Sequence, residues 1–408
     1  MNYQGITLRM TTEAGAFFSL GIGLGLCLPY LQKKCLKYQK SHREKMYSLS
    51  LKKKSPKCLV CGGAGYIGTH TIVSLLEAGY DVVIVDNLSN SKETSVDRLR
   101  KLTKCDVNRI SLFVIDMCNL RDLESVFLES GPFDCCIHLA GYKAVGESVL
   151  YPLKYIENNI MSTVQLLKLL DKYACRSLVF SSSATVYGNS KYFPYNELSL
   201  TGIGITNAYA RSKFMIEQIL QDFHASKKTE YTGLKNPWYI VSLRYFNPVG
   251  AHESGLLGED PYGVPNNLVP LITQVLQGKR EKLSIYGNDY ETNDGTCLRD
   301  YIHVMDLAEG HVSALRYIDD NKRKKGEGMQ EVFNLGSGNG YSVIQMIKAM
   351  EKASGYKVPF SITPRRPGDV CTSYASTRKA NTILNWKATR SLDTICKDTW
   401  KWILNSKK

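Results

Sequence analysis

The chain has 408 residues, of which 43% are hydrophobic, and its formal net charge at pH 7 is +14. This apolar fraction is that of a folded protein and excludes a largely disordered chain, and the length allows two domains or one large α/β unit with an extension. Residues 32–57 carry ten Lys or Arg and one Glu, a balance of +9, while residues 1–31 balance to zero, so the rest of the chain carries only +5. The excess charge thus belongs to one segment, and we predict no nucleic-acid partner for the main body.

The first 56 residues are expected to form an N-terminal extension. Within it, residues 14–31 (AGAFFSLGIGLGLCLPYL) contain no charged side chain, and their length reaches the lower limit for a helix that spans a bilayer. The basic run behind them would keep the following chain on the cytoplasmic side of a membrane. Two interpretations stay open: a membrane anchor through residues 14–31, or a disordered extension.

A strand, a glycine-rich turn, a helix and a second strand follow in the order that binds dinucleotides. The strands are predicted over Lys57–Val60 and Asp81–Val85, the turn reads GGAGYIG over residues 62–68, and the helix covers Thr69–Ala78. Asp86 ends the second strand 18 residues after the last glycine, close to the spacing of a dinucleotide-binding unit. The glycines let the backbone approach a pyrophosphate at the helix N-terminus. The Asp86 carboxylate would bind ribose hydroxyls and repel a 2′-phosphate, so NAD is favoured over NADP.

Apolar runs continue to alternate with helical patterns up to about residue 244. This pattern predicts three more strands and two helices: Ile110–Ile115, Cys135–Leu139 and Ser177–Phe180, with Leu120–Glu129 and Tyr155–Tyr173 between them. Alternation of this kind predicts an α/β fold, a Rossmann-like doubly wound parallel sheet, with ligands beyond the carboxyl ends of the strands. Asp116, Ala140, Ser183 and Tyr209 follow these ends and are expected to converge on one cleft; a capping role is the alternative for each.

The twelve cysteines do not suggest a disulfide framework, because most of them sit in apolar runs. Cys58 and Cys61 are three residues apart, so on a strand their side chains face opposite sides and do not easily form one metal or redox pair. No zinc-like Cys/His spacing is present in the sequence, and no metal site is predicted. Buried free thiols favour a reducing compartment, and the only Asn-x-Ser/Thr sequence, at Asn87, falls in the cofactor-binding segment. We therefore expect a cytoplasmic localisation.

Tyr209 and Lys213 are four residues apart, and residues at this spacing share one face of a helix. An ammonium beside a phenol favours the phenolate and lowers the pKa of the phenol, which would make Tyr209 a proton acceptor near neutral pH. Ser183 could hydrogen-bond the same substrate oxygen. Taken alone, the motif fits an amphipathic helix with one exposed lysine equally well.

Beyond Arg244 the sequence becomes rich in glycine, proline and loops. We therefore predict a NAD-binding domain at residues 57–244 and a smaller C-terminal α/β substrate domain at residues 245–408. Its candidate ligand groups are two amides, two arginines and a carboxylate: Asn247, Asn267, Arg299, Arg366 and Asp369. Arginine forks suit phosphate oxygens, and Tyr286 could stack on a base. Each residue taken alone could equally be a turn residue or a surface charge.

Residues 58 to about 403 resemble the UDP-glucose 4-epimerases of the extended short-chain dehydrogenase/reductase family. The matching segments occur in the order that the family has them: 62–68, 86–88, 143–148, 181–188, 245–252, 258–260, 265–268, 287–290, 299–307, 364–369 and 398–400. They cover nearly all of the chain beyond the extension, and no single motif carries the resemblance.

The resemblance implies tightly bound NAD, UDP-sugar substrates and a homodimer. It implies that Tyr209 takes the proton of the sugar 4-hydroxyl, that Ser183 supports the same oxygen, and that Lys213 lowers the pKa of the tyrosine and holds the nicotinamide ribose. The implied cofactor contacts are Gly62, Gly65, Tyr66, Ile67, Gly68, Asp86, Asn87, Asn90, Ser91, Asp116, Met117, Leu139, Ala140, Lys143, Asn158, Tyr209, Lys213 and Phe246. The implied substrate contacts are Lys143, Ser183, Tyr209, Asn247, Asn267, Leu268, Tyr286, Arg299, Arg366, Asp369 and Ser373.

The resemblance also bears on substrate range. Ser373 aligns with the residue that lines the sugar N-acetyl region, where the bulky tyrosine of the family's bacterial members excludes N-acetylated sugars. A small residue leaves room, so we predict interconversion of UDP-GlcNAc and UDP-GalNAc in addition to that of UDP-glucose and UDP-galactose.

Three other functions have to be weighed. A sugar-nucleotide 4,6-dehydratase needs an Asp-Glu pair after the active-site Ser or Thr, and this chain has Ala184-Thr185-Val186 there. A UDP-glucuronate epimerase would need a cation for the sugar carboxylate, which the sequence alone does not exclude. A non-catalytic NAD-binding scaffold would not need Ser183, Tyr209 and Lys213 together.

Overall fold

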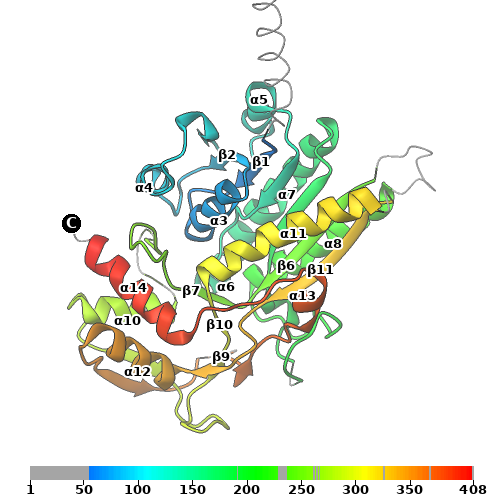
Figure 1. The fold of residues 1–408 in the computed structure, drawn as a ribbon. Helices are drawn as coiled ribbons and strands as arrows, with labels where there is room; N and C mark the ends of the chain where they lie inside the picture. The colour runs from blue at the N-terminus through cyan, green and yellow to red at the C-terminus, as the bar shows by residue number, and fades with distance from the viewer. Residues whose placement is uncertain are drawn as a thin grey trace, which may run out of the picture. The chain divides into compact units, whose positions relative to one another are not determined.

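A seven-stranded parallel sheet forms the centre of the fold, in the order β11-β6-β5-β4-β1-β2-β3 (Figure 1). Its strands are β1 Lys57–Cys61, β2 Asp81–Asp86, β3 Ile110–Val114, β4 Cys135–His138, β5 Ser177–Ser183, β6 Tyr239–Tyr245 and β11 Met329–Leu335. The strand order reverses direction between β1 and β4, which is where doubly wound sheets bind their ligands. The predicted fold class is confirmed.

The computed structural model describes residues 55–406 except 191, 228–236, 261, 263–264, 266, 325–326 and 367–368. The proposed anchor at residues 14–31 lies outside the described residues, as does most of the basic run behind it. Among the residues that are described, no helix is both long and apolar enough to cross a membrane.

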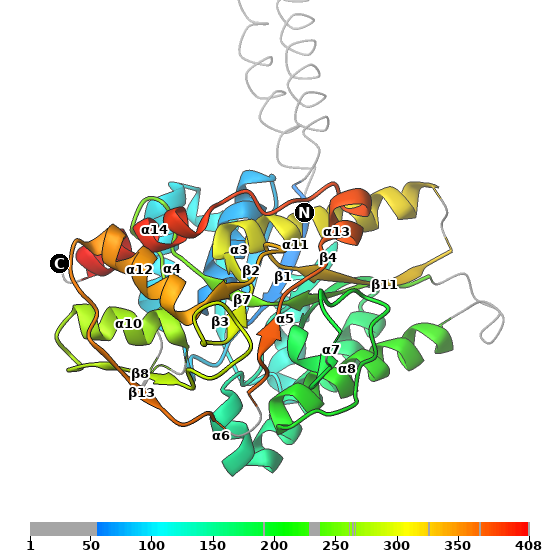
Figure 2. The same ribbon diagram turned by 90° about the horizontal axis from the view of Figure 1, so that it is seen from below.

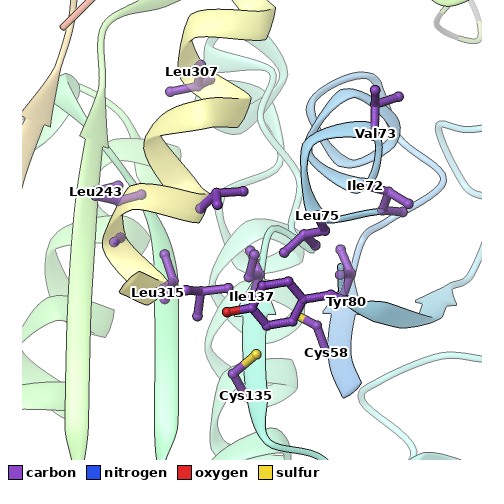
Figure 3. Close-up of a cluster of buried hydrophobic side chains, with 14 of the residues drawn as sticks. Cys58, Ile72, Val73, Leu75, Tyr80, Cys135, Ile137, Leu243, Leu307 and Leu315 are labelled. Atoms are coloured by element: carbon purple, nitrogen blue, oxygen red, sulfur yellow. The ribbon is translucent and has the colours of Figure 1, made fainter. Parts of the chain in front are cut away.

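Helices cover both faces of the sheet. On one face, α3 (Tyr66–Glu77) and α11 (Val304–Lys324) pack side by side over a cluster of buried aliphatic side chains (Figures 1 and 3). On the other face lie α5 (Leu120–Ser130), α7 (Pro152–Lys172) and α8 (Ala208–Ser226), of which α7 and α8 are neighbours (Figure 2). Strands buried on both faces read as continuous apolar runs, which is why they were visible in the sequence.

The two cysteines of β1 show how the sheet separates its faces. Cys58 belongs to the cluster under α3 and α11, close to Cys135 (Figure 3), and Cys61 belongs to the cluster under α5, α7 and α8. Their opposite orientation was expected from the sequence and is confirmed.

The segments after β6 build a third cluster of buried side chains, to which α10, α12, α14 and strand β8 contribute, and β8 pairs with β13. The remaining elements are α4 Glu93–Thr103, η1 Val107–Arg109, α6 Val145–Leu150, η2 Ala184–Tyr187, β7 Asn247–Val249, α10 Leu268–Leu276, β8 Leu283–Tyr286, β9 Leu298–Arg299, β10 Tyr301–His303, β12 Tyr341–Ser342, α12 Val343–Ser354, β13 Phe360–Thr363, β14 Thr372–Ser373, α13 Arg378–Ile383 and α14 Leu392–Ser406.

The chain returns to the central sheet after residue 245, because α11 and β11 complete the sheet from the C-terminal side. Residues 56–408 group as one compact unit by their contacts. A division into domains between residues 244 and 245 therefore stays a prediction.

Candidate active site

One cavity of about 1180 Å³ lies at the carboxyl ends of the strands. Most of the predicted site residues line it: Gly62, Gly65, Tyr66, Ile67, Gly68, Asp86, Asn87, Asn90, Ser91, Asp116, Met117, Leu139, Ala140, Lys143, Asn158, Ser183, Phe246, Asn247, Asn267, Arg299, Arg366, Asp369 and Ser373. Four predicted residues are not on its wall, namely Tyr209, Lys213, Leu268 and Tyr286. The structure thus brings residues that are up to 311 positions apart in the sequence, Gly62 and Ser373, to one site.

The glycine turn after β1 is packed too closely for side chains. A Cβ on Gly62, whose φ is +77°, would lie 2.6 Å from the backbone nitrogen of Ala140, and a Cβ on Gly68 would lie 2.4 Å from the carbonyl oxygen of Gly62. Helix α3 then begins at Tyr66 without a side-chain cap from its N-cap residue, Gly65. The first backbone N–H groups of the helix are therefore available to an anion such as a pyrophosphate.

Asp86 at the end of β2 is almost fully buried, and its carboxylate is fixed by three donors. Oδ2 accepts from the backbone N–H of Ala64 at 3.0 Å, and Oδ1 accepts from the N–H of Leu88 at 2.9 Å and from the Ser91 hydroxyl at 2.8 Å. Two carboxylate oxygens have room for about four hydrogen bonds, so the group can still accept from a ribose hydroxyl. The tight turn, the uncapped helix and this carboxylate together fit NAD.

Asp116 and Asn158 lie further along the same groove. The Asp116 carboxylate accepts from the N–H of Cys118 at 2.8 Å, and the thiol of Cys118 reaches the carbonyl of Asn158 at 3.7 Å. Asn158 donates to the side chain of Asn159, which in turn holds the loop after β4 through Tyr142. The groove residues beyond β3 and β4 are thus tied to one another.

Ser183 lines the cavity, and Tyr209 contacts it from helix α8. Ser183 is the last residue of β5, and its oxygen accepts from the Thr185 hydroxyl at 2.9 Å and from the Thr185 N–H at 3.3 Å. Tyr209 lies in the first turn of α8, which Asn207 caps by accepting from Ala210 N–H at 2.8 Å, and the phenol is hydrogen-bonded to the Ser183 side chain. Because the Ser183 oxygen already accepts from Thr185, its own hydrogen is directed to Tyr209 or to a ligand oxygen.

Burial raises the pKa of Tyr209 above its ordinary value, while the hydrogen bond from Ser183 and the positive charge of Lys143 lower it. Lys143 is half exposed and ion-paired with Glu259 at 3.1 Å, and this carboxylate raises the pKa of the lysine, which keeps it charged. The sequence had suggested Lys213 as the cation that acts on Tyr209. Lys213 instead donates to the carbonyl of Ser181 at 2.6 Å, and burial lowers its pKa to about 8. Its effect on Tyr209 stays a prediction.

Charged side chains from the C-terminal segments form the opposite wall. Asp369 bridges two guanidinium groups, at 2.9 Å from Nε of Arg366 and 3.6 Å from Nη2 of Arg299. The Arg366 guanidinium lies 4.6 Å from the ring centre of Tyr286. One face of the Tyr286 ring is thus occupied by an arginine, and Tyr286 is 39% exposed without lining the cavity. Two arginines and a stacked ring are suited to a nucleotide phosphate and base.

The remaining predicted residues lie between these walls. Asn247 donates through its backbone and side-chain nitrogens to the carbonyl of Asp300, at 3.0 and 2.9 Å. Asn267 is the N-cap residue of α10, which Leu268 begins. Ser373 is half buried in β14, in register with Arg299 of β9.

The acidic loop Gly258–Asp260 was not assigned a role from the sequence, although it matched the family. Besides the pairing of Glu259 with Lys143, Asp260 pairs with Lys92 at 2.9 Å and Arg98 at 3.7 Å, and the Glu259 carbonyl accepts from the indole of Trp402 at 3.3 Å. These residues of the loop line the cavity. The two acids of Gly-Glu-Asp were the available signal, but their cationic partners lie more than 100 residues away.

The chain is similar to known proteins over most of its length. The family model described as GDP-mannose 4,6 dehydratase matches residues 59–399. UDP-glucose 4-epimerase 2 of Arabidopsis thaliana is 52% identical over 348 residues, which cover 85% of this chain and 95% of the relative.

Two solved structures extend the comparison. The UDP-glucose 4-epimerase of Bifidobacterium longum, solved with NAD+ and UDP, is 46% identical and superposes with a TM-score of 0.79 over 86% of this chain and 99% of that chain. The UDP-Glc/GlcNAc 4-epimerase of Campylobacter jejuni is 33% identical, with a TM-score of 0.70 over 86% of this chain and 99% of that chain.

Proposed function

Because the chain belongs to the UDP-glucose 4-epimerase family, we propose that it interconverts UDP-galactose and UDP-glucose through a 4-keto intermediate with tightly bound NAD. The observation that carries this proposal is the contact of Tyr209 with Ser183, which lines a cavity that has a dinucleotide groove on one side and two arginines on the other.

NAD, when bound, accepts the hydride from C4 of the sugar and later returns it to the other face. The chain's own residues handle the proton. Tyr209 takes the proton of the 4-hydroxyl at its phenol oxygen and gives it back after the sugar has turned. Ser183 donates to the same substrate oxygen, since its acceptor positions are used by Thr185. The charge of Lys143 lowers the pKa of the phenol, against the effect of burial.

Inversion at C4 requires a sugar that can turn while the nucleotide stays fixed. We assign the fixed part to Arg299, Arg366 and Asp369, whose charges suit a diphosphate and ribose, with Asn267, Leu268 and Tyr286 nearer the uridine. Asn247 and Lys143 would meet the sugar side. The cofactor is assigned to the groove from Gly62 to Asn158, with Phe246 beside the active site and Lys213 at the nicotinamide ribose.

We further propose that UDP-GlcNAc and UDP-GalNAc are substrates. Ser373 is small and lines the cavity, and a UDP-Glc/GlcNAc 4-epimerase is among the similar structures. Ser373→Tyr should reduce UDP-GalNAc conversion at least tenfold while UDP-galactose conversion is largely kept. The tyrosine ring would occupy the space that the N-acetyl group needs, and a mismatch of even one methylene in a pocket costs about 1–3 kcal/mol. A wild-type enzyme without detectable UDP-GalNAc conversion would contradict this part.

A 4,6-dehydratase is the second candidate, because the matching family model carries that description. Elimination needs an acid and a base beside the site, and the described residues directly after Ser183 are Ala184, Thr185 and Val186 in η2. None of these three carries a carboxyl group, so the epimerase is favoured. A 4-keto-6-deoxy product from any tested nucleotide sugar would reverse this choice.

We also propose a homodimer, a cytoplasmic location and a role in galactose metabolism. Helices α6, α7 and α8 pack against one another and expose apolar side chains, among them Val149, Leu150, Leu153, Met161 and Met215. Clustered exposed apolar residues are typical of interaction surfaces. The ten described cysteines are free, which agrees with a reducing compartment. Light scattering of the purified protein tests the dimer, and Leu153→Glu should yield monomer.

The function itself is tested by incubating the purified protein with UDP-galactose and no added NAD. Formation of UDP-glucose is expected, since the cofactor would be retained through purification. Absence of product both without and with added NAD would refute the proposed function, whereas product only with added NAD would refute the tight retention.

A further inference from the structure

Three successive serines at the end of β5 each hold one residue of helix α8. The Ser183 side chain bonds to the phenol of Tyr209, the Ser181 carbonyl accepts from Lys213 Nζ at 2.6 Å, and the Ser182 hydroxyl donates to Glu217 at 2.5 Å. Tyr209, Lys213 and Glu217 follow one another at intervals of four, so they form one stripe on the helix. The contact between Ser182 and Glu217 has no part in the proposed reaction.

Glu217 is held by a second element as well. Its carboxylate takes two hydrogen bonds from Arg244, with Nε at 3.0 Å and Nη2 at 2.7 Å, and both side chains are only 6% exposed. Arg244 is the β6 residue in register with Ser182 of β5. Its remaining contact runs from Nη1 to the Tyr187 hydroxyl at 3.0 Å, and that hydroxyl donates to Asn334 of β11 at 2.6 Å. The carboxylate is thus bonded directly to two adjacent strands, β5 and β6, and linked to β11 through Arg244 and Tyr187.

A buried ion pair of this kind is weak evidence for a role in stability. Desolvation of the two charges offsets much of their attraction, so well-packed apolar residues often serve as well. Its orientation matters more here, because bidentate geometry fixes the carboxylate in one place. That place is one helical turn from Lys213 and two turns from Tyr209, on the side of the helix that faces the strand ends.

Lys213 needs a nearby negative charge to stay protonated, because it is buried. It is buried, it lies 4.9 Å from the ring centre of Phe180, and burial lowers its pKa to about 8 while the Glu217 carboxylate raises it. On β4, His138 also lies within electrostatic reach of Lys213, but its pKa is lowered to about 3 by burial and by the lysine, so it is neutral. Arg244, which pairs with Glu217, is a cation and cannot be a counter-charge for the lysine. Of the described groups, Glu217 is therefore the carboxylate that acts on Lys213.

We propose that Glu217 is a positioning residue for the catalytic pair. Clamped by Ser182 and Arg244, it sets the register of α8 on β5 so that Tyr209 meets Ser183, and it supplies the counter-charge that keeps the buried Lys213 ionised. The proposal rests on the proposed function and adds to it that turnover needs a charged Lys213.

The test is the pH dependence of kcat for UDP-galactose in Glu217→Gln, with Glu217→Asp as the conservative control. The amide keeps the shape and removes the charge, so Lys213 loses its proton at a lower pH. We expect the alkaline limb of kcat to move to lower pH by about one unit, because a nearby opposite charge shifts a pKa by about 1–3 units. Glu217→Asp retains the charge and should keep the limb near its wild-type position, although its kcat is lowered by the shorter reach.

Stability and NAD content are measured on the same samples. A structural role alone predicts a lower melting temperature for Glu217→Gln with an unchanged pH limb, and that result would overturn the proposal. If unpaired Arg244 prevents folding of this variant, Glu217→Gln combined with Arg244→Met removes both charges and is expected to fold. Its limb should still move to lower pH, but by less, because a cation is removed together with the anion. An unshifted limb in the double variant overturns the proposal equally. Wild-type protein that does not turn over UDP-galactose refutes the proposed function instead, so the two failures are distinguishable.

Discussion

The two walls of the cavity are built on different principles. On the cofactor side, the ligand groups are backbone atoms, a glycine turn in which an added Cβ would clash, and a carboxylate that three protein donors already hold in place. On the nucleotide-sugar side, the groups are long charged side chains that are partly exposed, with 53% of Arg366 and 17% of Arg299 accessible, and they are paired with Asp369.

This difference matches two modes of binding. A pre-organised groove loses little entropy when its ligand binds, which favours a cofactor that stays bound. Arginines that are neutralised by an internal carboxylate have to exchange that partner, at least in part, for the phosphates of an incoming ligand. Such a site binds through charge and can release its ligand, as a substrate that must leave requires. Ser183 lines the same cavity, and Tyr209 contacts Ser183.

The comparison predicts that turnover can be abolished without weakening the binding of NAD or of UDP. In Tyr209→Phe the proton acceptor is lost, so kcat should fall by about 10²–10⁴, the range that general acid–base catalysis contributes. NAD content after purification and UDP affinity should be close to wild type. The control is Tyr192→Phe at an exposed tyrosine. Wild-type turnover in Tyr209→Phe would show that another group moves the proton.

Substitutions in the nucleotide-sugar wall should weaken substrate binding and leave NAD binding unchanged. Arg366→Met should raise the KM for UDP-galactose by about 10- to 100-fold, because charge-assisted hydrogen bonds contribute about 1.5–3 kcal/mol, and kcat should change little. Arg365→Met is the matched control, since Arg365 is the neighbouring arginine but pairs with Asp289. NAD loss from Arg366→Met, measured in the heat-denatured supernatant, would contradict the separation of the walls.

Substitutions in the cofactor wall should weaken NAD binding. In Gly62→Ala the new Cβ lies 2.6 Å from the Ala140 nitrogen at a φ of +77°, so the turn has to shift. We expect NAD to bind about tenfold more weakly, which corresponds to a loss of about 1.4 kcal/mol in binding, and the purified protein to retain less NAD than wild type. Gly79→Ala carries the same backbone strain, at φ +88°, but its Cβ meets no heavy atom within 4 Å. It should lose about 1–2 kcal/mol of folding stability and keep its NAD.

The smallest effect is expected at Lys143, which connects the two walls through Glu259. Its charge lowers the pKa of Tyr209, so in Lys143→Met this pKa rises. Because the phenol has to be ionised to take a proton, the acid limb of kcat/KM should move to higher pH, by about half a unit to one unit for a partly solvated pair. Lys352→Met, which removes a surface pair with Asp393, should leave the limb in place. A shift to lower pH would show that the sign of this interaction is wrong.

Much of this site was predictable because it follows local rules. The spacing from Gly68 to Asp86 and the positions after β3, β4 and β5 depend on where the strands end, and apolar runs mark these ends. The residues predicted at these positions line the cavity, whereas Tyr209 on helix α8 does not. The shared face of Tyr209 and Lys213 follows from helix geometry alone, and α8 confirms it.

The electrostatic partners were not predictable, because they depend on contacts between distant segments. Lys143 meets Glu259 across 116 positions, and Arg366 covers Tyr286 from another loop. Glu217 was visible as the third member of the Tyr209 stripe, but nothing in the sequence indicated that Ser182 and Arg244 would hold it. The return of α11 and β11 to the sheet was missed for the same reason, since strand order is a property of the whole fold.

The most direct test of the central claim follows the hydrogen at C4. Purified protein without added NAD is given UDP-galactose that carries deuterium at C4, in ordinary water, and the UDP-glucose formed is analysed by mass spectrometry. Transfer to the retained cofactor and back, with only the hydroxyl proton passing through Tyr209, predicts that the product keeps its deuterium at C4. Replacement of the deuterium by solvent hydrogen would contradict this account, because the C4 hydrogen would then have left as a proton.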